Sequence, residues 1–251
     1  MGDFFINCFL NVKFTEYFKH NSLIMNPILK IGHRGAKGHA AENTLESIGK
    51  AMKLGVNGVE IDVHRCASGE LVVFHDFTLN RMTDGSGEVS KFTFKELQKL
   101  KVTGNCKIPT LAQVLTLIDN KCLLNIELKG KDTAKEASRI ITFYVDKKGW
   151  DYSNFIVSSF QKELLQTVHE INDKIPLGVL TDTDLDKAVT FAKKIKASTI
   201  LPIYTMLTEE NVLELQEDFK VITFTVNNLK PLERIKSYGV DGIISDYPDR
   251  I

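Results

Sequence analysis

The feature that most constrains the fold is an alternation of strand-like and helix-like segments that begins at residue 27. The strand-like runs are short and most are rich in Ile, Val and Leu, which is typical of parallel strands covered on both faces. They lie at 28–33, 57–64, 71–75, 122–128, 155–159, 177–181, 199–203, 221–226 and 242–246. A strand followed by a helix, repeated along the chain, indicates parallel strands with helices outside them.

Helix-like segments occupy most of the intervals between these runs. Thr44 and Thr208 each stand where a side chain could accept a hydrogen bond from the first turn of a helix. The predicted helices are 43–54, 93–100 with 110–119, 132–148, 161–173, 183–195, 208–218 and 229–238.

The second and third runs are too close in sequence to be parallel neighbours. Arg65 to Glu70 is shorter than the dozen or more residues that a parallel crossover needs, so an antiparallel hairpin is expected. A turn centred on Ser68-Gly69 would place Asp62 opposite His75. The eight remaining runs predict a (β/α)8 TIM barrel, with the extra antiparallel hairpin strand and a short insertion after the second barrel strand. The alternative is an open doubly wound sheet, although no G-x-G-x-x-G follows the first strand.

The length of the chain suits a single barrel, and its charge gives no reason to expect a polyanionic partner. The chain has 251 residues, and we expect one domain over 25–251 preceded by an extension, 1–24, of uncertain status and no catalytic role. Lys plus Arg and Asp plus Glu both total 32, so no basic field favours nucleic acid or an anionic membrane. No apolar stretch predicts a signal peptide or stable membrane association.

The cysteines favour a reducing compartment, which we take to be the cytoplasm. There are four in the chain, none in C-x-x-C spacing, and four are too few to serve as a disulfide framework for 251 residues. We expect buried structural thiols.

Carboxylates at strand ends predict a metal site. Glu60 and Asp62 are two residues apart on one run, so their side chains share a face, and Glu127 and Lys129 do the same on another. Three carboxylates buried in a barrel without a cation would cost several kcal/mol each. Oxygen ligands suit Mg²⁺ or Ca²⁺. The alternative interpretation is that these acids form buried ion pairs with Arg34 and Lys129.

Two histidines at strand ends complete a set suited to phosphate-ester hydrolysis. His33 and His75 can move protons near neutral pH. Arg34 and Lys129 can meet the charge of a phosphate. The other histidines of the barrel region, His39, His64 and His169, lie off this set and are expected to be packing or surface residues.

Nine short blocks follow one another between residue 31 and residue 248: His33-Arg34-Gly35, Glu42-Asn43-Thr44, Glu60-Ile61-Asp62-Val63, His75-Asp76, Pro109-Thr110-Leu111, Asn125-Ile126-Glu127-Leu128-Lys129, Ser159-Phe160, Thr225-Val226-Asn227 and Gly242-Ile243-Ile244-Ser245-Asp246-Tyr247-Pro248. In this order they resemble the glycerophosphodiester phosphodiesterase family, in its short bacterial form without a cap domain. The chain departs from the family pattern at Phe224, where a tryptophan is common, and at His39-Ala40-Ala41, where a proline usually precedes Glu42.

The resemblance implies metal-dependent hydrolysis of a small glycerophosphodiester to glycerol 3-phosphate and an alcohol. It implies His33 as the base and His75 as the acid. It also indicates that Ser159 and Phe224 line the substrate pocket, and that Glu42 and Asn43 support the site rather than bind the metal directly.

Two other functions stay open. A related barrel could act on lysophospholipid or phosphoinositide, although the insertion 76–108 is polar with only scattered Phe. A barrel that binds a phosphodiester without cleaving it would require the loss of a ligand or a histidine, and none is lost. The nucleophile, water or the glycerol 2-hydroxyl, is not decided by sequence.

Overall fold

Eight parallel strands close into a ring in the computed structural model, which describes residues 27–251. β1 pairs with β2 on one side and with β9 on the other, so the predicted TIM barrel is confirmed and the open-sheet alternative is wrong. The ring strands are β1 (Leu29–Gly32), β2 (Gly58–Arg65), β4 (Leu123–Leu128), β5 (Phe155–Ser159), β6 (Leu177–Thr181), β7 (Thr199–Pro202), β8 (Lys220–Thr223) and β9 (Gly242–Ser245). The predicted extension, 1–24, and the first two residues of the predicted domain, 25 and 26, lie outside the described residues, so this domain boundary stays a prediction.

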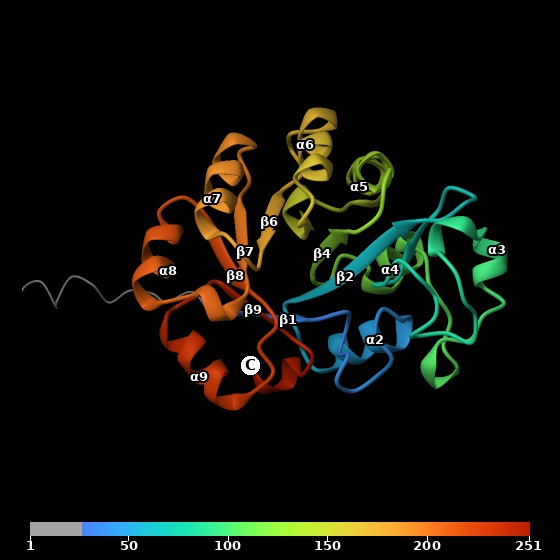
Figure 1. Cartoon of the computed structure of the whole chain (residues 1–251), viewed down its shortest axis with the longest axis horizontal. Helices are drawn as coiled ribbons and strands as arrows, with labels where there is room; N and C mark the ends of the chain where they lie inside the picture. Colours follow the sequence, from blue (N-terminus) through green and yellow to red (C-terminus); the bar gives the residue numbers. More distant parts are fainter. Residues whose placement is uncertain (1–26) are drawn as a thin grey trace, which may run out of the picture.

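Helices surround the ring (Figure 1). The Thr44 side chain accepts from Ser47 N, and Thr208 forms a capping box with Asn211, as their spacing predicts. The helices are α2 (Leu45–Lys53), α3 (Phe94–Leu97), α4 (Leu111–Ile118), α5 (Thr133–Lys148), α6 (Lys162–Ile171), α7 (Leu185–Lys194), α8 (Glu209–Gln216) and α9 (Leu229–Ser237). Single 3₁₀ turns lie at η1 (Val89–Lys91), η2 (Thr103–Asn105), η3 (Tyr152–Asn154), η4 (Tyr204–Met206) and η5 (Pro248–Arg250).

The extra strand β3 (Leu71–Val73) pairs antiparallel with β2 outside the ring, as predicted, but the predicted register is wrong by one residue. Asp62 accepts from Phe74 N rather than lying opposite His75. The cause is the turn, which is one residue longer than a two-residue loop: Cys66 N donates to Glu70 O, and Gly69 takes a φ of 104°. His75 therefore lies beyond the end of β3, and the strand pairing does not position it.

Side-chain alternation divides the core into two layers. Outward residues of the strands, such as Ile61 and Ile126, pack with the helices in the larger apolar cluster. Inward residues, such as Ile31, Ile156 and Ile222, fill the inside of the ring. The inward face of β2 and β4 then carries carboxylates instead of aliphatic side chains, and these are the residues predicted to bind a metal.

The segment between β3 and α4 folds around a small core of its own. Leu79, Val89 and Leu97 are fully buried against Val72 of β3. Figure 1 shows α3 and its flanking loops at the side of the molecule nearest α2 and α4. This insertion, polar by composition, is therefore a packed structure that can hold side chains in place.

The turn after β1 depends on Gly35. This residue has a φ of 84°, and a Cβ there would lie 2.6 Å from Ser47 C and 2.7 Å from Ile48 N, at the start of α2. Only glycine accommodates both the left-handed backbone and the close approach to α2. The turn sets the direction of His33 and Arg34, so glycine here serves the site as well as the fold.

We expect Gly35→Ala to lower the melting temperature strongly, because the strained φ and the backbone clash each destabilise the native state. Gly49→Ala is the matched control, since no atom lies within 4 Å of its added Cβ in α2. That change should leave the protein equally stable or raise its stability by about 1 kcal/mol through helix propensity. Thermal unfolding of both variants tests this, and equal melting temperatures would contradict it.

Candidate active site

Three buried carboxylates meet inside the ring, at the carboxyl ends of β2 and β4. Glu60 and Asp62 come from β2 and Glu127 from β4, and the parallel pairing of the two strands sets Asp62 beside Glu127. One ligand oxygen from each residue lies within 4.8 Å of the other two. The sequence-based expectation that these three carboxylates converge is therefore confirmed.

One oxygen of each carboxylate accepts no hydrogen bond. Among residues 27–251, the buried side-chain polar atoms without a hydrogen-bond partner are Glu60 Oε1, Asp62 Oδ1 and Glu127 Oε1. Lys129 Nζ forms ion pairs with two of these oxygens, at 2.6 Å to Glu127 Oε1 and 3.3 Å to Asp62 Oδ1. Buried polar atoms are nearly always satisfied in native proteins. Three orphan oxygens within one small cluster fit the ligand set of a hard divalent cation.

Burial and the repulsion between neighbouring carboxylates change the pKa values of the three acids. Burial, followed by the charges of Asp62 and Glu127, raises the pKa of Glu60 well above its ordinary value. Burial likewise raises the pKa of Glu127 to about 7. Burial would also raise the pKa of Asp62, but Lys129 and Arg34 lower it overall. The ionised forms of Glu60 and Glu127 are therefore disfavoured at this site, and a bound metal cation would favour them.

His33 is held in an orientation that suits a base. Its Nδ1 lies 2.5 Å from Asp246 Oδ1, and Asn227 Nδ2 donates to the other carboxylate oxygen at 2.9 Å. When Nδ1 donates to Asp246, Nε2 remains an acceptor, and Arg34 Nε donates to it at 3.2 Å. Burial lowers the pKa of His33, which keeps the ring neutral near pH 7. Its Nε2 is 4.0 Å from Glu60 Oε2, at the edge of the carboxylate cluster.

His75 has the same arrangement on another carboxylate. Its Nδ1 lies 2.6 Å from Asp76 Oδ1, and its backbone carbonyl accepts from His64 Nε2 at 3.1 Å. Burial lowers the pKa of His75, while the charge of Asp62 acts to raise it. A bound phosphodiester anion would act in the same direction as Asp62.

Two cations lie beside the carboxylates. Arg34 donates its backbone N–H to Glu60 Oε2 at 2.9 Å, and its Nε is 3.3 Å from Asp62 Oδ2. Burial would lower the pKa values of Arg34 and Lys129, but the surrounding carboxylates raise both overall. Both side chains therefore remain charged next to the place where a phosphate would bind.

Glu42 and Asn43 form hydrogen bonds with neighbouring residues of the site, and their assignment as supports of a metal site stays a prediction. Glu42 Oε1 accepts from Arg34 Nη1 at 2.7 Å. Asn43 donates to Asp62 Oδ2 at 2.8 Å and accepts from Asp62 N at 3.2 Å, so it fixes the carboxylate through both ends of its amide. Neither belongs to the converging carboxylate trio.

The two residues assigned to the pocket wall have different positions. Ser159 is buried, and its hydroxyl donates to Leu128 O and accepts from Gln161 N, so it ties the end of β4 to the residues that follow β5; its place in the pocket wall stays a prediction. Phe224 packs edge-to-face with Phe160, with ring centroids 5.8 Å apart. Lys129 Nζ lies 6.0 Å from the Phe160 centroid, which places this aromatic pair beside the cationic side of the site.

Four residues that the sequence reasoning did not assign take part in the site. Asp76 and Asp246 orient the histidines, His64 holds the backbone of His75, and Arg81 of the insertion binds Asp76 and Glu42. His64 was expected to be a packing or surface residue; it is buried and shares the inward face of Glu60 and Asp62. The only sequence signal was the position of Asp76 and Asp246 inside two of the quoted blocks. Nothing local identified Arg81.

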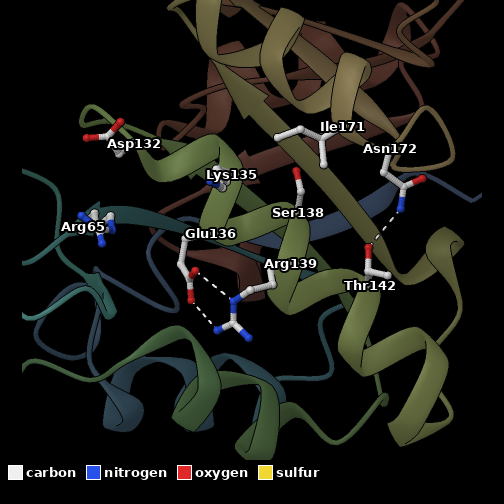
Figure 2. Close-up of a pocket in the computed structure, with 9 residues that line it drawn as sticks. All are labelled: Arg65, Asp132, Lys135, Glu136, Ser138, Arg139, Thr142, Ile171 and Asn172. Carbon is white, nitrogen blue, oxygen red and sulfur yellow. Dashed lines mark hydrogen bonds and ion pairs between the residues drawn. The ribbon is translucent and has the colours of Figure 1, made fainter.

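A hollow of about 720 Å³ lies elsewhere, along the outer side of α5 (Figure 2). Arg139 and Glu136 pair with each other there through two hydrogen bonds. None of the carboxylate trio or the two histidines lines it; its walls are Arg65, Asp132, Lys135, Glu136, Ser138, Arg139, Thr142, Ile171 and Asn172. We assign this hollow no part in the chemistry.

The fold and the site define a hydrolase of the TIM-barrel class that acts on phosphate esters. The glycerophosphoryl diester phosphodiesterase family matches residues 33–250. The glycerophosphodiester phosphodiesterase of Bacillus altitudinis is 34% identical over 238 residues, which cover 87% of this chain and 94% of the relative. That of Caldanaerobacter subterraneus subsp. tengcongensis is 33% identical over 233 residues, covering 89% and 96%.

A solved structure agrees with the sequence relatives. An Oleispira antarctica phosphodiesterase in complex with the product sn-glycerol-3-phosphate superimposes with a TM-score of 0.80 at 28% identity, covering 88% of this chain and 94% of that one. The chain belongs to the glycerophosphoryl diester phosphodiesterase family, and it is a phosphodiesterase of that family.

Two further findings bear on the predictions about membrane association and about a reducing compartment. Within residues 27–251, no helix has both the length and the apolar character needed to cross a bilayer. Cys66 is buried, Cys106 and Cys122 are partly buried, and all three are free thiols; Cys8 lies outside the described residues. The compartment stays a prediction.

In the presence of a chelator, we expect Glu127→Gln to become more stable relative to the unchanged protein as pH rises. The pKa of Glu127 is about 7 in the folded state against 4.5 as a free group, so between these values the native state keeps a proton that the unfolded chain has lost. Stability from this group is therefore present below pH 4.5 and is lost as pH rises to about 7.

The measurement is the difference in melting temperature between the variant and the unchanged protein across roughly pH 5 to 8. The difference is needed because His33 and His75 have lowered pKa values and contribute the opposite slope to both proteins. A difference that stays constant with pH would show that Glu127 titrates normally.

Proposed function

We propose that this enzyme hydrolyses small glycerophosphodiesters to glycerol 3-phosphate and an alcohol, with one divalent cation and two histidines. The observation that carries the proposal is the set of three orphan oxygens, one each on Glu60, Asp62 and Glu127. Buried ion pairs with Arg34 and Lys129 are a weaker account, because Lys129 contacts Asp62 Oδ1 and Glu127 Oε1 but Glu60 Oε1 has no ion-pair or hydrogen-bond partner among residues 27–251. The product in the Oleispira antarctica structure supports the substrate class.

The carboxylate trio would hold Mg²⁺ or Ca²⁺, both of which take oxygen ligands. When bound, such an ion supplies positive charge that polarises the phosphate and makes a nearby hydroxyl or water easier to deprotonate. Asn43 keeps Asp62 in place for this role through its paired hydrogen bonds. The Arg34 backbone N–H does the same for Glu60.

His33 takes a proton from the nucleophile at Nε2. Asp246 binds the opposite ring nitrogen, which leaves Nε2 free of a proton and stabilises the imidazolium that forms. The lowered pKa of His33 keeps the free enzyme in the form that can accept a proton.

His75 delivers a proton to the alkoxide that leaves phosphorus. Asp76 accepts a hydrogen bond from Nδ1–H, so the ring acts as the doubly protonated imidazolium, whose Nε2–H gives its proton to the leaving group and leaves a neutral imidazole. Arg34 and Lys129 stay charged beside the carboxylates and meet the negative charge that grows on the phosphate oxygens in the transition state. The Phe160–Phe224 pair is the apolar side of the site, against which the carbon chain of glycerol can lie.

Chelation should abolish turnover, and added Mg²⁺ or Ca²⁺ should restore it and raise the melting temperature. An ion at ~100 times its dissociation constant stabilises the native state by about 2.7 kcal/mol. Glu127→Gln should weaken this rise, whereas Glu136→Gln on the outer face of α5 serves as the matched control and should not. Turnover and melting temperature that ignore both chelator and metal would contradict the proposal.

His33→Ala and His75→Ala should each lower kcat by ~10²–10⁴-fold, with little change in KM. A glycerol 3-phosphate ester of p-nitrophenol has a good leaving group and hardly needs an acid. His75→Ala should regain much of its rate on that ester, whereas His33→Ala should not. Equal behaviour of the two variants would leave the base and acid assignments without support.

The pH profile supplies an independent check of the base. The ascending limb of kcat/KM should have an apparent pKa below 6.5, because burial lowers the pKa of His33 from that value and the base works only when deprotonated. An ascending limb centred above neutral pH would contradict the assignment.

A further inference from the structure

Arg81, in the insertion, joins the two sides of the active site through three nitrogens. Its Nε donates to Asp76 Oδ2 at 2.7 Å, and its Nη2 donates to Asp76 Oδ1 at 2.9 Å. The same Nη2 donates to Glu42 Oε1 at 2.6 Å, and Nη1 donates to Glu42 Oε2 at 3.1 Å. One guanidinium thus binds both oxygens of two different carboxylates.

The first carboxylate leads to His75. Asp76 Oδ1 is shared between Arg81 Nη2 and His75 Nδ1, so the position of the Asp76 carboxylate sets the plane of the imidazole ring. Because β3 ends at Val73, no strand register holds His75. Its ring is positioned by Asp76, and Asp76 is gripped in bidentate fashion by Arg81.

The second carboxylate leads to Arg34. Glu42 Oε1 accepts from both Arg81 Nη2 and Arg34 Nη1, so the buried carboxylate holds two guanidinium groups at once. Burial would raise the pKa of Glu42, but the hydrogen bonds and charges of the two arginines lower it to about 2, which keeps the carboxylate ionised. Arg34 in turn lies 3.3 Å from Asp62, next to the phosphate position.

The fold of the insertion fixes Arg81 itself. Leu79, two residues earlier, is fully buried in the small core, and the carbonyl of Met82 accepts from Thr103 N at 2.9 Å. The Arg81 side chain is 46% exposed, whereas Glu42 is 5% exposed, so the guanidinium reaches inward from the rim. An arginine that fixed only the surface of the insertion would not need to reach Glu42.

We propose that Arg81 is a positioning residue that aligns the His75 ring and the Arg34 guanidinium on the same phosphodiester. This inference rests on the proposed role of His75 as the acid. Lysine cannot replace Arg81 fully, because a single ammonium nitrogen cannot grip two carboxylates in bidentate fashion.

The test compares Arg81→Gln and Arg81→Lys with Arg139→Gln, a matched control whose guanidinium also makes a bidentate contact with a carboxylate, that of Glu136, but on the outer face of α5 (Figure 2). Each variant is assayed with glycerophosphocholine and with the p-nitrophenyl ester of glycerol 3-phosphate. Arg81→Gln should lose roughly 10- to 100-fold in kcat on the choline ester and much less on the p-nitrophenyl ester, because misplacing the acid matters only for the poor leaving group.

The contact from Arg81 through Glu42 to Arg34 is tested by KM. Arg81→Gln should raise KM for both esters, since the phosphate is met by a less fixed guanidinium, and Arg81→Lys should fall between Arg81→Gln and the unchanged enzyme. Arg139→Gln should stay within about 2-fold of the unchanged enzyme on both esters. Melting temperatures are recorded for every variant; if Arg81→Gln does not fold, Arg81→Lys supplies the same contrast between esters.

The outcomes separate the two proposals. Equal losses on both esters, or values that match Arg139→Gln, would overturn the positioning role of Arg81 while His75→Ala still recovers on the p-nitrophenyl ester. If His75→Ala itself shows no recovery on that ester, the acid assignment under the proposed function fails first and takes this inference with it.

Discussion

The structure depends on the burial of three negative charges at one end of a closed barrel. Glu60, Asp62 and Glu127 replace the aliphatic side chains that fill the rest of the ring, and their orphan oxygens leave the metal-free cluster short of positive charge. Several surrounding groups stabilise that charge: the backbone N–H of Arg34 and the amide of Asn43 each contact one of the acids, and the ammonium of Lys129 contacts two.

A barrel can place these carboxylates side by side because the carboxyl ends of its parallel strands lie at the same edge of the ring. The β2–β4 register brings Asp62 beside Glu127, and the closure of β1 on β2 brings His33 and Arg34 to the same edge. The groups of the proposed active site therefore come from several strands, each fixed by backbone hydrogen bonds to its neighbours. His75 follows β3, which lies outside the ring, and side chains hold it in place instead of strand pairing.

The insertion contributes Arg81, a residue of the site that lies outside the ring strands. Its small core holds Arg81 at the rim, and Arg81 binds both the carboxylate that orients His75 and the carboxylate that orients Arg34. Each histidine then has a carboxylate on Nδ1, Asp246 for His33 and Asp76 for His75. The two ring nitrogens that remain are those able to exchange protons with a substrate.

The sequence by itself determined the barrel, the hairpin and the convergence of the three acids, because side-chain alternation and the carboxyl ends of parallel strands follow from local geometry. It did not determine the hairpin register, which shifted because the turn contains Ala67 as well as the predicted Ser68-Gly69 pair. It did not predict that the Ser159 hydroxyl joins the end of β4 to the residues that follow β5. The Arg81 network was decided only by tertiary structure, since its partner Glu42 lies 39 residues away and no periodic pattern records such a contact.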